Sequence, residues 1–251
     1  MESLTKSRVK LISSLSKKKE RDELGLFVAE GPKLVRDLST VFHCQSLLAT
    51  ETFWTENRIV ADSQVLVSEE ELKKISFLCA PQSVVAVFEK KERVAENVNL
   101  KNTLTLALDT IQDPGNLGTI IRLADWFGIE NVVCSRETVD VYNPKVVQAT
   151  MGALTRVNVY YTDLCQFIRE KAIGLPVYGT FLEGDSIYDE PLTKEGVVIM
   201  GNEGNGISDS LKKYVTKKLY IPNYPQNRET SESLNVAMAT AIACSEFRRR
   251  I

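Results

Sequence analysis

The chain has 251 residues, of which 43% are hydrophobic and 25% charged, and its formal net charge is −2. This composition is typical of a folded protein with one large or two modest domains, and the near-neutral charge excludes a polycation. No apolar run reaches eighteen residues, so we expect no transmembrane helix.

The N-terminal stretch MESLTKSRVKLISSLSKKKERDE lacks the continuous apolar core of a secretory signal. Its Ser and Lys content would suit a mitochondrial presequence, but Glu20, Asp22 and Glu23 count against one, and we expect a cytoplasmic protein. Residues 1–24 carry seven basic side chains against four acidic ones. This local excess suits either a nucleic-acid partner or a plain solvated helix face.

The first ninety residues alternate between strand-like and helix-like patterns, which predicts a compact α/β unit. The expected helices cover 5–15, 31–41, 51–57 and 69–77, and the expected strands cover 26–30, 44–50, 64–68 and 83–89. The polar segment 91–103 has no clear periodicity, and we interpret it as a linker.

A second alternation begins at residue 104 and continues to the C-terminus. Its strand-like runs are 103–109, 131–135, 156–161, 176–182, 196–201 and 217–222, separated by helical patterns at 116–127, 144–153, 162–173, 207–214 and 233–249. Apolar strands joined by helical crossovers indicate a parallel sheet with helices on both faces. Because ligands bind beyond the carboxyl ends of such strands, the loops 109–116, 201–206 and 221–233 are the candidate site.

Cysteine and histidine chemistry is restricted in this chain. His43 is the only histidine. The five cysteines form no C-x-x-C pair; they are Cys44, Cys79, Cys134, Cys165 and Cys244. We therefore expect free thiols in a reducing cytoplasm and no metal site. A Ser-His-Asp or Cys-His mechanism would have to use His43, at an apparent strand start, and we disfavour it.

The first loop joins a turn, Asp113-Pro114-Gly115-Asn116, directly to a helix. Asn116 is a good N-cap residue, so the loop could simply be a capped helix start. That interpretation leaves Arg122 unexplained among the apolar residues of the same helix. An unpaired buried arginine would be prohibitively costly, so its guanidinium must reach a partner or a cleft.

The second loop, VVIMGNEGNGIS, has the spacing G-x-x-G-x-G. This spacing disfavours a dinucleotide-binding fingerprint, and the absence of G-K-[ST] excludes a P-loop. In the third segment we expect Ser233 to cap a helix with a face of small residues at 236–243. That face could be a buried core surface or a dimer interface.

Together, NLGTIIRLA, MGNEGNGIS and IPNYPQNRETSESLNVAMATAIACSEF resemble the three motifs of the SpoU/TrmH group of RNA 2′-O-ribose methyltransferases, in the SPOUT class. The resemblance covers roughly residues 104–249, within an expected catalytic domain of residues 104–251. Residues 1–90, through FVAEGPKLVRDL, are similar to the ribosomal-protein-like substrate-binding domain that often precedes this catalytic domain. The resemblance implies an α/β fold with a deep trefoil knot, S-adenosyl-L-methionine as cofactor, no metal and a homodimer.

Carried over by motif position, the resemblance implies a catalytic pocket of Asn116, Arg122, Glu203, Ser233 and Asn235. The implied cofactor-binding residues are Thr180, Phe181, Gly201, Asn202, Gly206, Ile221, Pro222 and Leu234. Arg122 would anchor a phosphate near the target hydroxyl, because an arginine stays protonated, and Glu203 is a candidate proton acceptor. The segment 223–232, with Arg228 and Glu229, is longer than in many members, so its role is open.

The expected substrate is RNA, with ribosomal RNA favoured over tRNA by the two-domain layout. Two other functions remain as alternatives: a non-catalytic RNA-binding or ribosome-assembly protein, and, against the glycine spacing, a nucleotide-dependent oxidoreductase. The candidate RNA-binding side chains, any of which could be a plain solvated charge, are Arg8, Lys10, Lys17, Lys18, Lys19, Arg36, Lys145 and Arg156.

Overall fold

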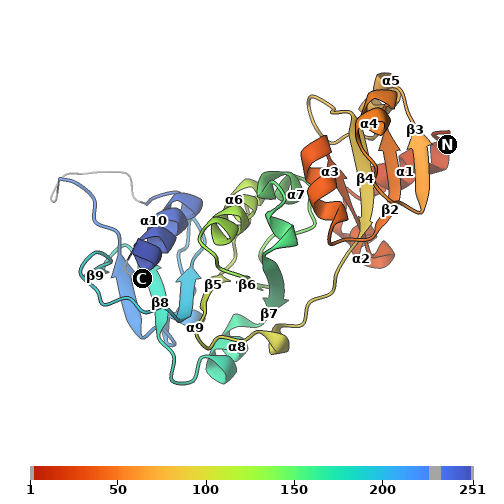
Figure 1. The fold of residues 1–251 in the computed structure, drawn as a ribbon. Helices are drawn as coiled ribbons and strands as arrows, with labels where there is room; N and C mark the ends of the chain where they lie inside the picture. Colours follow the sequence, from red (N-terminus) through yellow and green to blue (C-terminus); the bar gives the residue numbers. More distant parts are fainter. Residues whose placement is uncertain (1–2, 226–232, 250–251) are drawn as a thin grey trace. The chain divides into compact units, whose positions relative to one another are not determined.

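The structure, a computed structural model, describes residues 3–225 and 233–249 (Figure 1). The chain divides into two compact units, Met1–Glu92 with Asp140–Thr155, and Arg93–Val139 with Arg156–Ile251. The segment 140–155 therefore belongs to the first unit, although the sequence places it within the second alternation. The predicted division at residues 90 and 104 did not anticipate this grouping.

The first unit contains a four-stranded sheet in the order β1-β4-β2-β3. Strands β1 and β4 are antiparallel, as are β4 and β2, whereas β2 and β3 are parallel. Its strands are β1 (Leu26–Glu30), β2 (Cys44–Ala49), β3 (Ser63–Leu66) and β4 (Val84–Glu89). Its helices are α1 (Lys6–Ser14), α2 (Lys18–Leu24), α3 (Pro32–Ser39), α4 (Glu51–Glu56), α5 (Glu69–Ile75), α7 (Pro144–Thr150) and the 3-10 turn η2 (Ala153–Thr155).

Burial of apolar side chains holds α1, α5 and α7 to this sheet. Ile12 and Leu15 share one core cluster with Leu72 of α5 and Val28 of β1. Helix α7 packs against β1. Just before α7, the Tyr142 ring lies 4.7 Å from that of Phe27. The segment 140–155 is therefore part of the hydrophobic core of the first unit.

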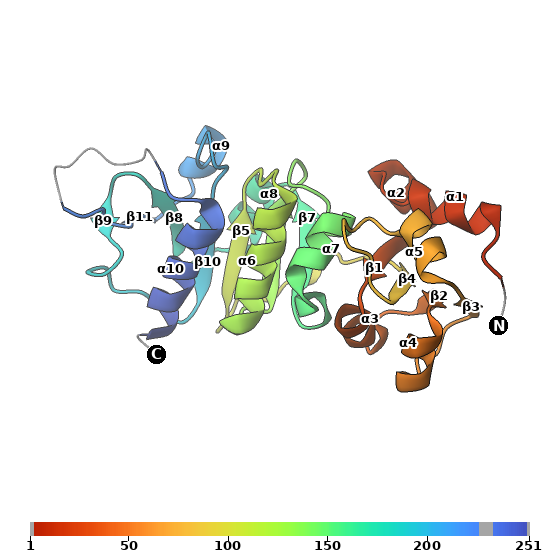
Figure 2. The ribbon, with the colours of Figure 1, turned by 90° about the horizontal axis from the view of Figure 1, so that it is seen from above.

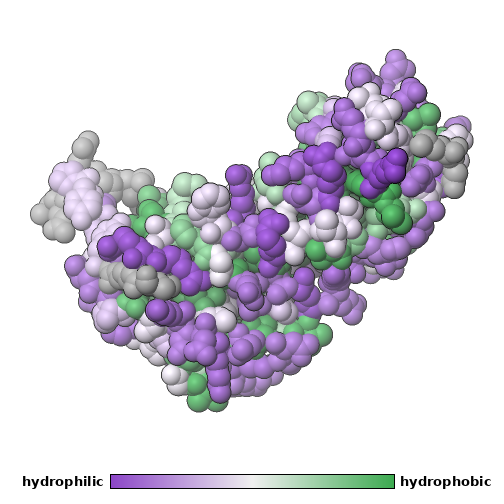
Figure 3. All heavy atoms as spheres, viewed as in Figure 1, coloured by the Kyte–Doolittle hydropathy of each residue, from purple (hydrophilic) through white to green (hydrophobic). Residues whose placement is uncertain are grey.

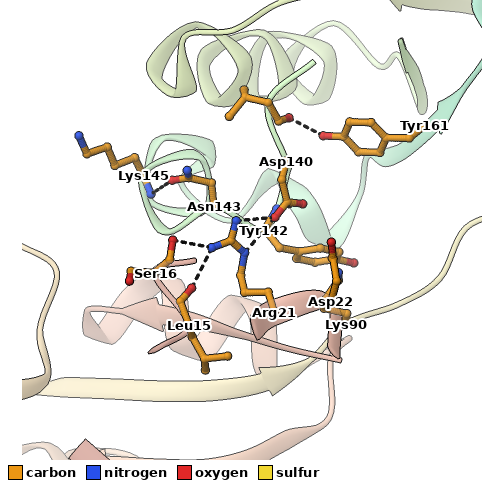
Figure 4. A network of polar contacts seen from close by, with 11 residues as sticks. Leu15, Ser16, Arg21, Asp22, Lys90, Asp140, Tyr142, Asn143, Lys145 and Tyr161 are labelled. Atoms are coloured by element: carbon orange, nitrogen blue, oxygen red, sulfur yellow. Dashed lines mark hydrogen bonds and ion pairs between the residues drawn. The ribbon is translucent and has the colours of Figure 1, made fainter. Parts of the chain in front are cut away.

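A buried ion pair joins the same segment to α2 (Figure 4). Arg21, which is 1% exposed, donates from Nε and Nη2 to Oδ2 of Asp140 at 2.9 and 2.7 Å. Its Nη1 donates to the carbonyl oxygens of Leu15 and Ser16 at 2.8 and 2.9 Å. The guanidinium thus meets a carboxylate and two carbonyls, which is how a charged group can be accommodated in a protein interior.

The second unit contains a seven-stranded sheet in the order β7-β6-β5-β10-β8-β11-β9, and every neighbouring pair is parallel. Its strands are β5 (Leu104–Leu108), β6 (Asn131–Ser135), β7 (Asn158–Thr162), β8 (Val177–Phe181), β9 (Asp185–Ser186), β10 (Gly196–Met200) and β11 (Lys217–Tyr220). Its helices are η1 (Ala95–Asn97), α6 (Pro114–Trp126), α8 (Leu164–Lys171), α9 (Asp209–Lys212) and α10 (Val236–Arg249). The predicted α/β fold with a parallel sheet is confirmed.

Helices cover both faces of this sheet (Figure 2). On one face, Leu164 and Phe167 of α8 and Leu211 of α9 share a core cluster with Ala107 and Val133 of the strands. Helices α6 and α10 pack together on the opposite face. There Phe247 of α10 lies edge-on against Tyr178 of β8, with ring centroids 4.9 Å apart.

The segment expected to be a linker is partly packed. Ala95, Val98 and Leu100 are buried in the same core cluster as α8. These three apolar residues lie among charged ones, so the sequence shows no periodic pattern that would predict their burial. Much of residues 93–103 therefore belongs to the second unit and is not a solvated tether.

On the face drawn in Figure 3, the described residues are mostly hydrophilic, and hydrophobic residues appear in separate patches. Among the described residues, no helix combines the length and the hydropathy required to cross a membrane.

Replacing Arg21 by Met should destabilise the first unit by roughly 3–5 kcal/mol, because the buried Asp140 carboxylate would lose its counter-charge. Replacing Arg21 by Met and Asp140 by Leu together should cost less than Arg21→Met alone. Urea unfolding, followed by fluorescence, measures both values.

The control is Lys19→Met, because Lys19 forms only an exposed ion pair with Glu23 at 3.6 Å. Such pairs contribute about 0–1 kcal/mol, so this variant should unfold like the wild type. A double variant that unfolds more easily than Arg21→Met would contradict the assignment of the cost to the unpaired carboxylate.

Candidate active site

The three candidate loops leave the carboxyl ends of β5, β10 and β11, and parallel strands bring these ends to one edge of the sheet. In the register of β5 and β10, Leu108 is opposite Met200. The pairing continues one step further, because the N–H of Asp109 donates to the carbonyl of Met200 at 2.9 Å. The loops 109–116 and 201–208 therefore begin side by side.

Three predicted residues meet at this edge. Nδ2 of Asn116 donates to Oε1 of Glu203 at 2.6 Å, and Nδ2 of Asn235 donates to Oδ1 of Asn116 at 3.0 Å. One residue comes from each of the three motifs, although up to 119 positions separate them in sequence. We call Asn116, Glu203 and Asn235 the amide–carboxylate cluster.

The N-cap of α6 is not the predicted residue, and this leaves the Asn116 side chain available to the cluster. Helix α6 begins at Pro114, and its N-cap is Asp113, whose Oδ1 accepts the N–H of Asn116 at 2.7 Å. The expected capping role of Asn116 is therefore wrong. Because Asp113 satisfies the backbone, the Asn116 carboxamide is available for Glu203.

The start of α10 was also assigned to the wrong cap. Oδ1 of Asn235 accepts the N–H groups of Ala237 and Met238 at 3.0 and 3.3 Å. Ser233 precedes it and is exposed, so the expected capping role of Ser233 is wrong. The amide of Asn235 thus caps α10 with its oxygen and orients Asn116 with its nitrogen.

The loop 201–206 closes on itself. Asn202 and Gly206 exchange backbone hydrogen bonds at 3.0 and 2.9 Å. A side chain on Gly201 would place its Cβ 2.3 Å from the backbone of Gly206, so only glycine fits there. The side chain of Asn202, one of the residues proposed for the cofactor, holds the loop: Nδ2 donates to the carbonyl of Thr110 at 2.8 Å, and Oδ1 accepts from Gly204 at 2.9 Å.

Two residues that the sequence did not single out fasten this loop to the first one. Asp109 is 5% exposed, and its Oδ2 accepts the N–H of Ser208 at 2.7 Å. Its Oδ1 accepts the hydroxyl of Thr110 at 3.1 Å. Thr110 has φ +58°, a costly conformation for a β-branched residue, and strain of this kind gathers at functional sites. The only sequence signal was an acidic residue directly after a buried strand.

The residues proposed for the cofactor lie at the same edge. Thr180 and Phe181 end β8, and the Thr180 hydroxyl donates to the carbonyl of Ile199 at 3.3 Å. Ile221 and Pro222 follow β11 and are half-buried. Large apolar side chains stand exposed on the neighbouring segments: Leu182 at 69%, Tyr224 at 72% and Leu234 at 49%. Glycine-rich backbone beside exposed apolar groups fits a ligand that combines flat apolar rings with polar edges.

Arg122 does not join the amide–carboxylate cluster. Its side chain is exposed, and among the described residues of its own chain the guanidinium has none of the hydrogen-bond or ion-pair partners that the sequence led us to expect. Six positions along a helix carry Arg122 about 240° around α6 from Asn116. It therefore shares the outer surface of the helix with Trp126, which is 83% exposed.

Some of the predicted RNA-binding side chains already have a polar partner within the protein, and others do not. Arg8 donates to Ser63, Arg36 donates to Asn57, and both Nε and Nη2 of Arg156 donate to Asp125. Within the described chain, the side chains of Lys10, Lys17, Lys18 and Lys145 have no hydrogen-bond or ion-pair partner, and that of Lys19 pairs with Glu23.

Three of the five cysteines are buried, and the only histidine is hydrogen-bonded to an exposed carboxylate. The pKa of His43 is raised mainly by its hydrogen bond with Asp62, at 2.8 Å, on the protein surface. Burial raises the pKa of the Cys44 and Cys244 thiols to about 12 and also raises that of Cys134. The residues 226–232, including Arg228 and Glu229, lie outside the part that the structure describes.

Comparison with known proteins connects this geometry to a family. Residues 103–245 match the model of the SpoU rRNA Methylase family, and residues 6–86 match the MRM3-like substrate binding domain. A 23S rRNA (guanosine(2553)-2′-O)-methyltransferase, RlmP, from Bacillus subtilis is 34% identical, over 99% of this chain and 98% of its own length.

Solved structures agree over almost the whole chain. A TrmH-family protein from Porphyromonas gingivalis is 40% identical, with a TM-score of 0.87 and 99% of each chain covered. An rRNA methyltransferase from Sinorhizobium meliloti, solved with AdoMet bound, is 30% identical, with a TM-score of 0.86, over 100% of this chain and 98% of its own. The chain described here therefore belongs to the SpoU rRNA Methylase family.

Proposed function

We propose that this protein transfers a methyl group from S-adenosylmethionine to a ribose 2′-hydroxyl of ribosomal RNA. The observation that carries the proposal is the amide–carboxylate cluster, built from three separate loops at the ligand-binding edge of a SpoU family domain. Relatives named for 23S rRNA 2′-O-methylation support the substrate class. A cytoplasmic location and a knotted chain path stay predictions.

The cluster gives Glu203 a defined orientation. Asn235 orients the amide of Asn116, and that amide donates to Oε1 of Glu203. Oε2 has no hydrogen bond within the described residues, so it is available as an acceptor. S-adenosylmethionine, when bound, supplies a methyl group on a positively charged sulfur, and the S–CH₃ bond breaks as the 2′-O–CH₃ bond forms and the hydroxyl loses its proton. Glu203 is positioned to accept that proton.

The proposed cofactor region has backbone donors and acceptors in the loops 201–206 and 221–223, together with exposed apolar side chains. Gly201, Gly206, Ile221, Pro222 and Leu234 would hold the adenosine part mainly through backbone and apolar contacts. Thr180 and Phe181 would border it. Alignment of the two reacting groups can lower the activation free energy by an amount on the order of several kcal/mol.

We propose that a second copy of the chain completes the site. Arg122 lies on a different side of α6 from the cluster of its own chain, so it can contact substrate held by a partner's cluster. The small residues Val236, Ala237, Thr240 and Ala243 are buried within their own chain, as in a core helix. The exposed apolar residues Trp126 and Met238, on α6 and α10, are the better candidates for the contact.

Arg122→Ala should lower methyl transfer by about 100-fold, because a charged group that stabilises negative charge near the hydroxyl would be lost. The measurement is transfer of tritium from labelled S-adenosylmethionine to total RNA that lacks its native modifications. Alkali-resistant label identifies ribose methylation. Arg122→Lys is the matched variant, and wild-type turnover in it would contradict a bidentate role for the guanidinium.

Asp109→Asn should weaken S-adenosylmethionine binding by roughly tenfold, since one amide oxygen cannot replace the two carboxylate acceptors and a buried donor is left unpaired. Isothermal titration calorimetry measures the affinity. Asp113→Asn is the control, because asparagine also caps helices well and this variant should bind like the wild type. If both variants bind S-adenosylmethionine with equal affinity, the hydrogen bond from Ser208 to Asp109 does not support cofactor binding.

Trp126→Glu should convert a dimer to a monomer and abolish methyl transfer, because a carboxylate would be buried in the proposed interface. Sedimentation equilibrium gives the mass in solution. Ile173, which is 78% exposed beyond the end of α8, provides the control variant Ile173→Glu, which should stay dimeric and active. A monomeric wild type would exclude the second copy from the site.

A further inference from the structure

The first unit has a hollow of about 260 Å³ that the methyl-transfer site does not use. It is lined by the end of β1 around Glu30, by Phe77 and Leu78 after α5, and by one face of α7. We call it the Glu30 hollow. Small-molecule sites usually begin at about 300 Å³, so the hollow has room for one ring system and not for a whole nucleoside cofactor.

A buried carboxylate fixes one wall of the hollow. Glu30 is 3% exposed, its oxygens accept the Ser76 hydroxyl and, at 2.7 Å, the N–H of Phe77, and burial raises its pKa. The hydroxyl of Ser76 in turn accepts the N–H of Leu78 at 3.1 Å. Burying a carboxylate is costly, and here it holds Phe77 and Leu78 in a set position.

The opposite wall offers polar groups without partners. Lys145, Gln148 and Ala149 are spaced by three and four positions, so they share one face of α7. In the described part of the chain, neither the Gln148 carboxamide nor the Lys145 ammonium has a hydrogen-bond or ion-pair partner. Gln148 is half-buried, whereas Lys145 is exposed.

These features select the chemistry of the occupant. Apolar walls and the Phe77 ring favour a flat aromatic group, and a free carboxamide can donate to and accept from its edge. The carboxylate of Glu30 disfavours an anion inside the hollow, whereas the Lys145 ammonium favours one outside it. A base with a phosphate attached has both properties, and single-stranded RNA presents unstacked bases in this form.

We propose that the Glu30 hollow binds one unstacked base of the substrate RNA, with Lys145 contacting a neighbouring phosphate. This inference rests on the proposed function, because it takes the RNA substrate from it. It assigns a role to the buried carboxylate of Glu30, which the methyl-transfer chemistry leaves unexplained.

The test compares full-length variants in methyl transfer to ribosomal RNA. Ala149→Met fills the hollow without removing a polar group, and it should raise the KM for RNA about tenfold, as expected from losing one stacked base. The kcat and the KM for S-adenosylmethionine should not change. Gln148→Ala should act in the same direction, and Lys145→Ala should in addition weaken the salt dependence of RNA binding.

Lys73→Ala is the matched control, because Lys73 is exposed on α5 of the same unit and does not line the hollow. It should keep the wild-type KM for RNA. The melting temperature of each variant should lie within about 2 °C of the wild type. A change of this size corresponds to a loss of less than about 1 kcal/mol, so the fold is retained. Wild-type KM values in Ala149→Met and Gln148→Ala would overturn the proposal.

A second readout separates this proposal from the proposed function. RNA carrying 4-thiouridine is cross-linked to the wild-type protein, and the attached peptide is identified by mass spectrometry. Cross-links within residues 76–78 or 144–149 support the hollow, whether or not methyl transfer is detected. Methyl transfer without cross-links in these peptides overturns the hollow and leaves the proposed function intact.

Discussion

The candidate site depends on the register between β5 and β10. Leu108 lies opposite Met200, and the Asp109–Met200 hydrogen bond continues the ladder beyond both strands. The loops 109–116 and 201–208, which belong to different motifs, therefore start at a fixed distance from each other. Asp109 then binds Ser208, and Thr110 accepts from Asn202, so the second loop is held along its length. A shift of register by one residue would move all of these contacts apart.

The charges at this edge have a common sign. Asp109 and Glu203 are carboxylates that accept hydrogen bonds from N–H, O–H or amide groups, and neither forms an ion pair within the described chain. Such an edge disfavours the phosphates of RNA and favours a positively charged group. A sulfonium cofactor meets that condition. The RNA needs cations from elsewhere, and exposed groups such as Arg122 can supply them.

The sequence predicted the layers, the parallel sheet and the three loops, because apolar strands and helical spacing have strong periodic signals. It did not predict which side chains cap the helices. Asp113 and Asn116 are both suitable caps, and only the path of the turn decides between them. The sequence did not show that Arg122 is exposed for a related reason: its apolar neighbours in sequence do not share its side of the helix. Asp109 was missed because its partner Ser208 lies ninety-nine residues away.

The membership of residues 140–155 in the first unit has a consequence for synthesis of the chain. Arg21 emerges from the ribosome long before Asp140, and Phe27 long before Tyr142. Until then the guanidinium has no carboxylate partner, and one edge of the first sheet lacks the helix that packs against β1. The N-terminal unit therefore cannot reach its final form as an early, independent folding event. Its completion has to await more than half of the polypeptide, so a nascent chain stalled before residue 140 would still expose surface for chaperones to bind.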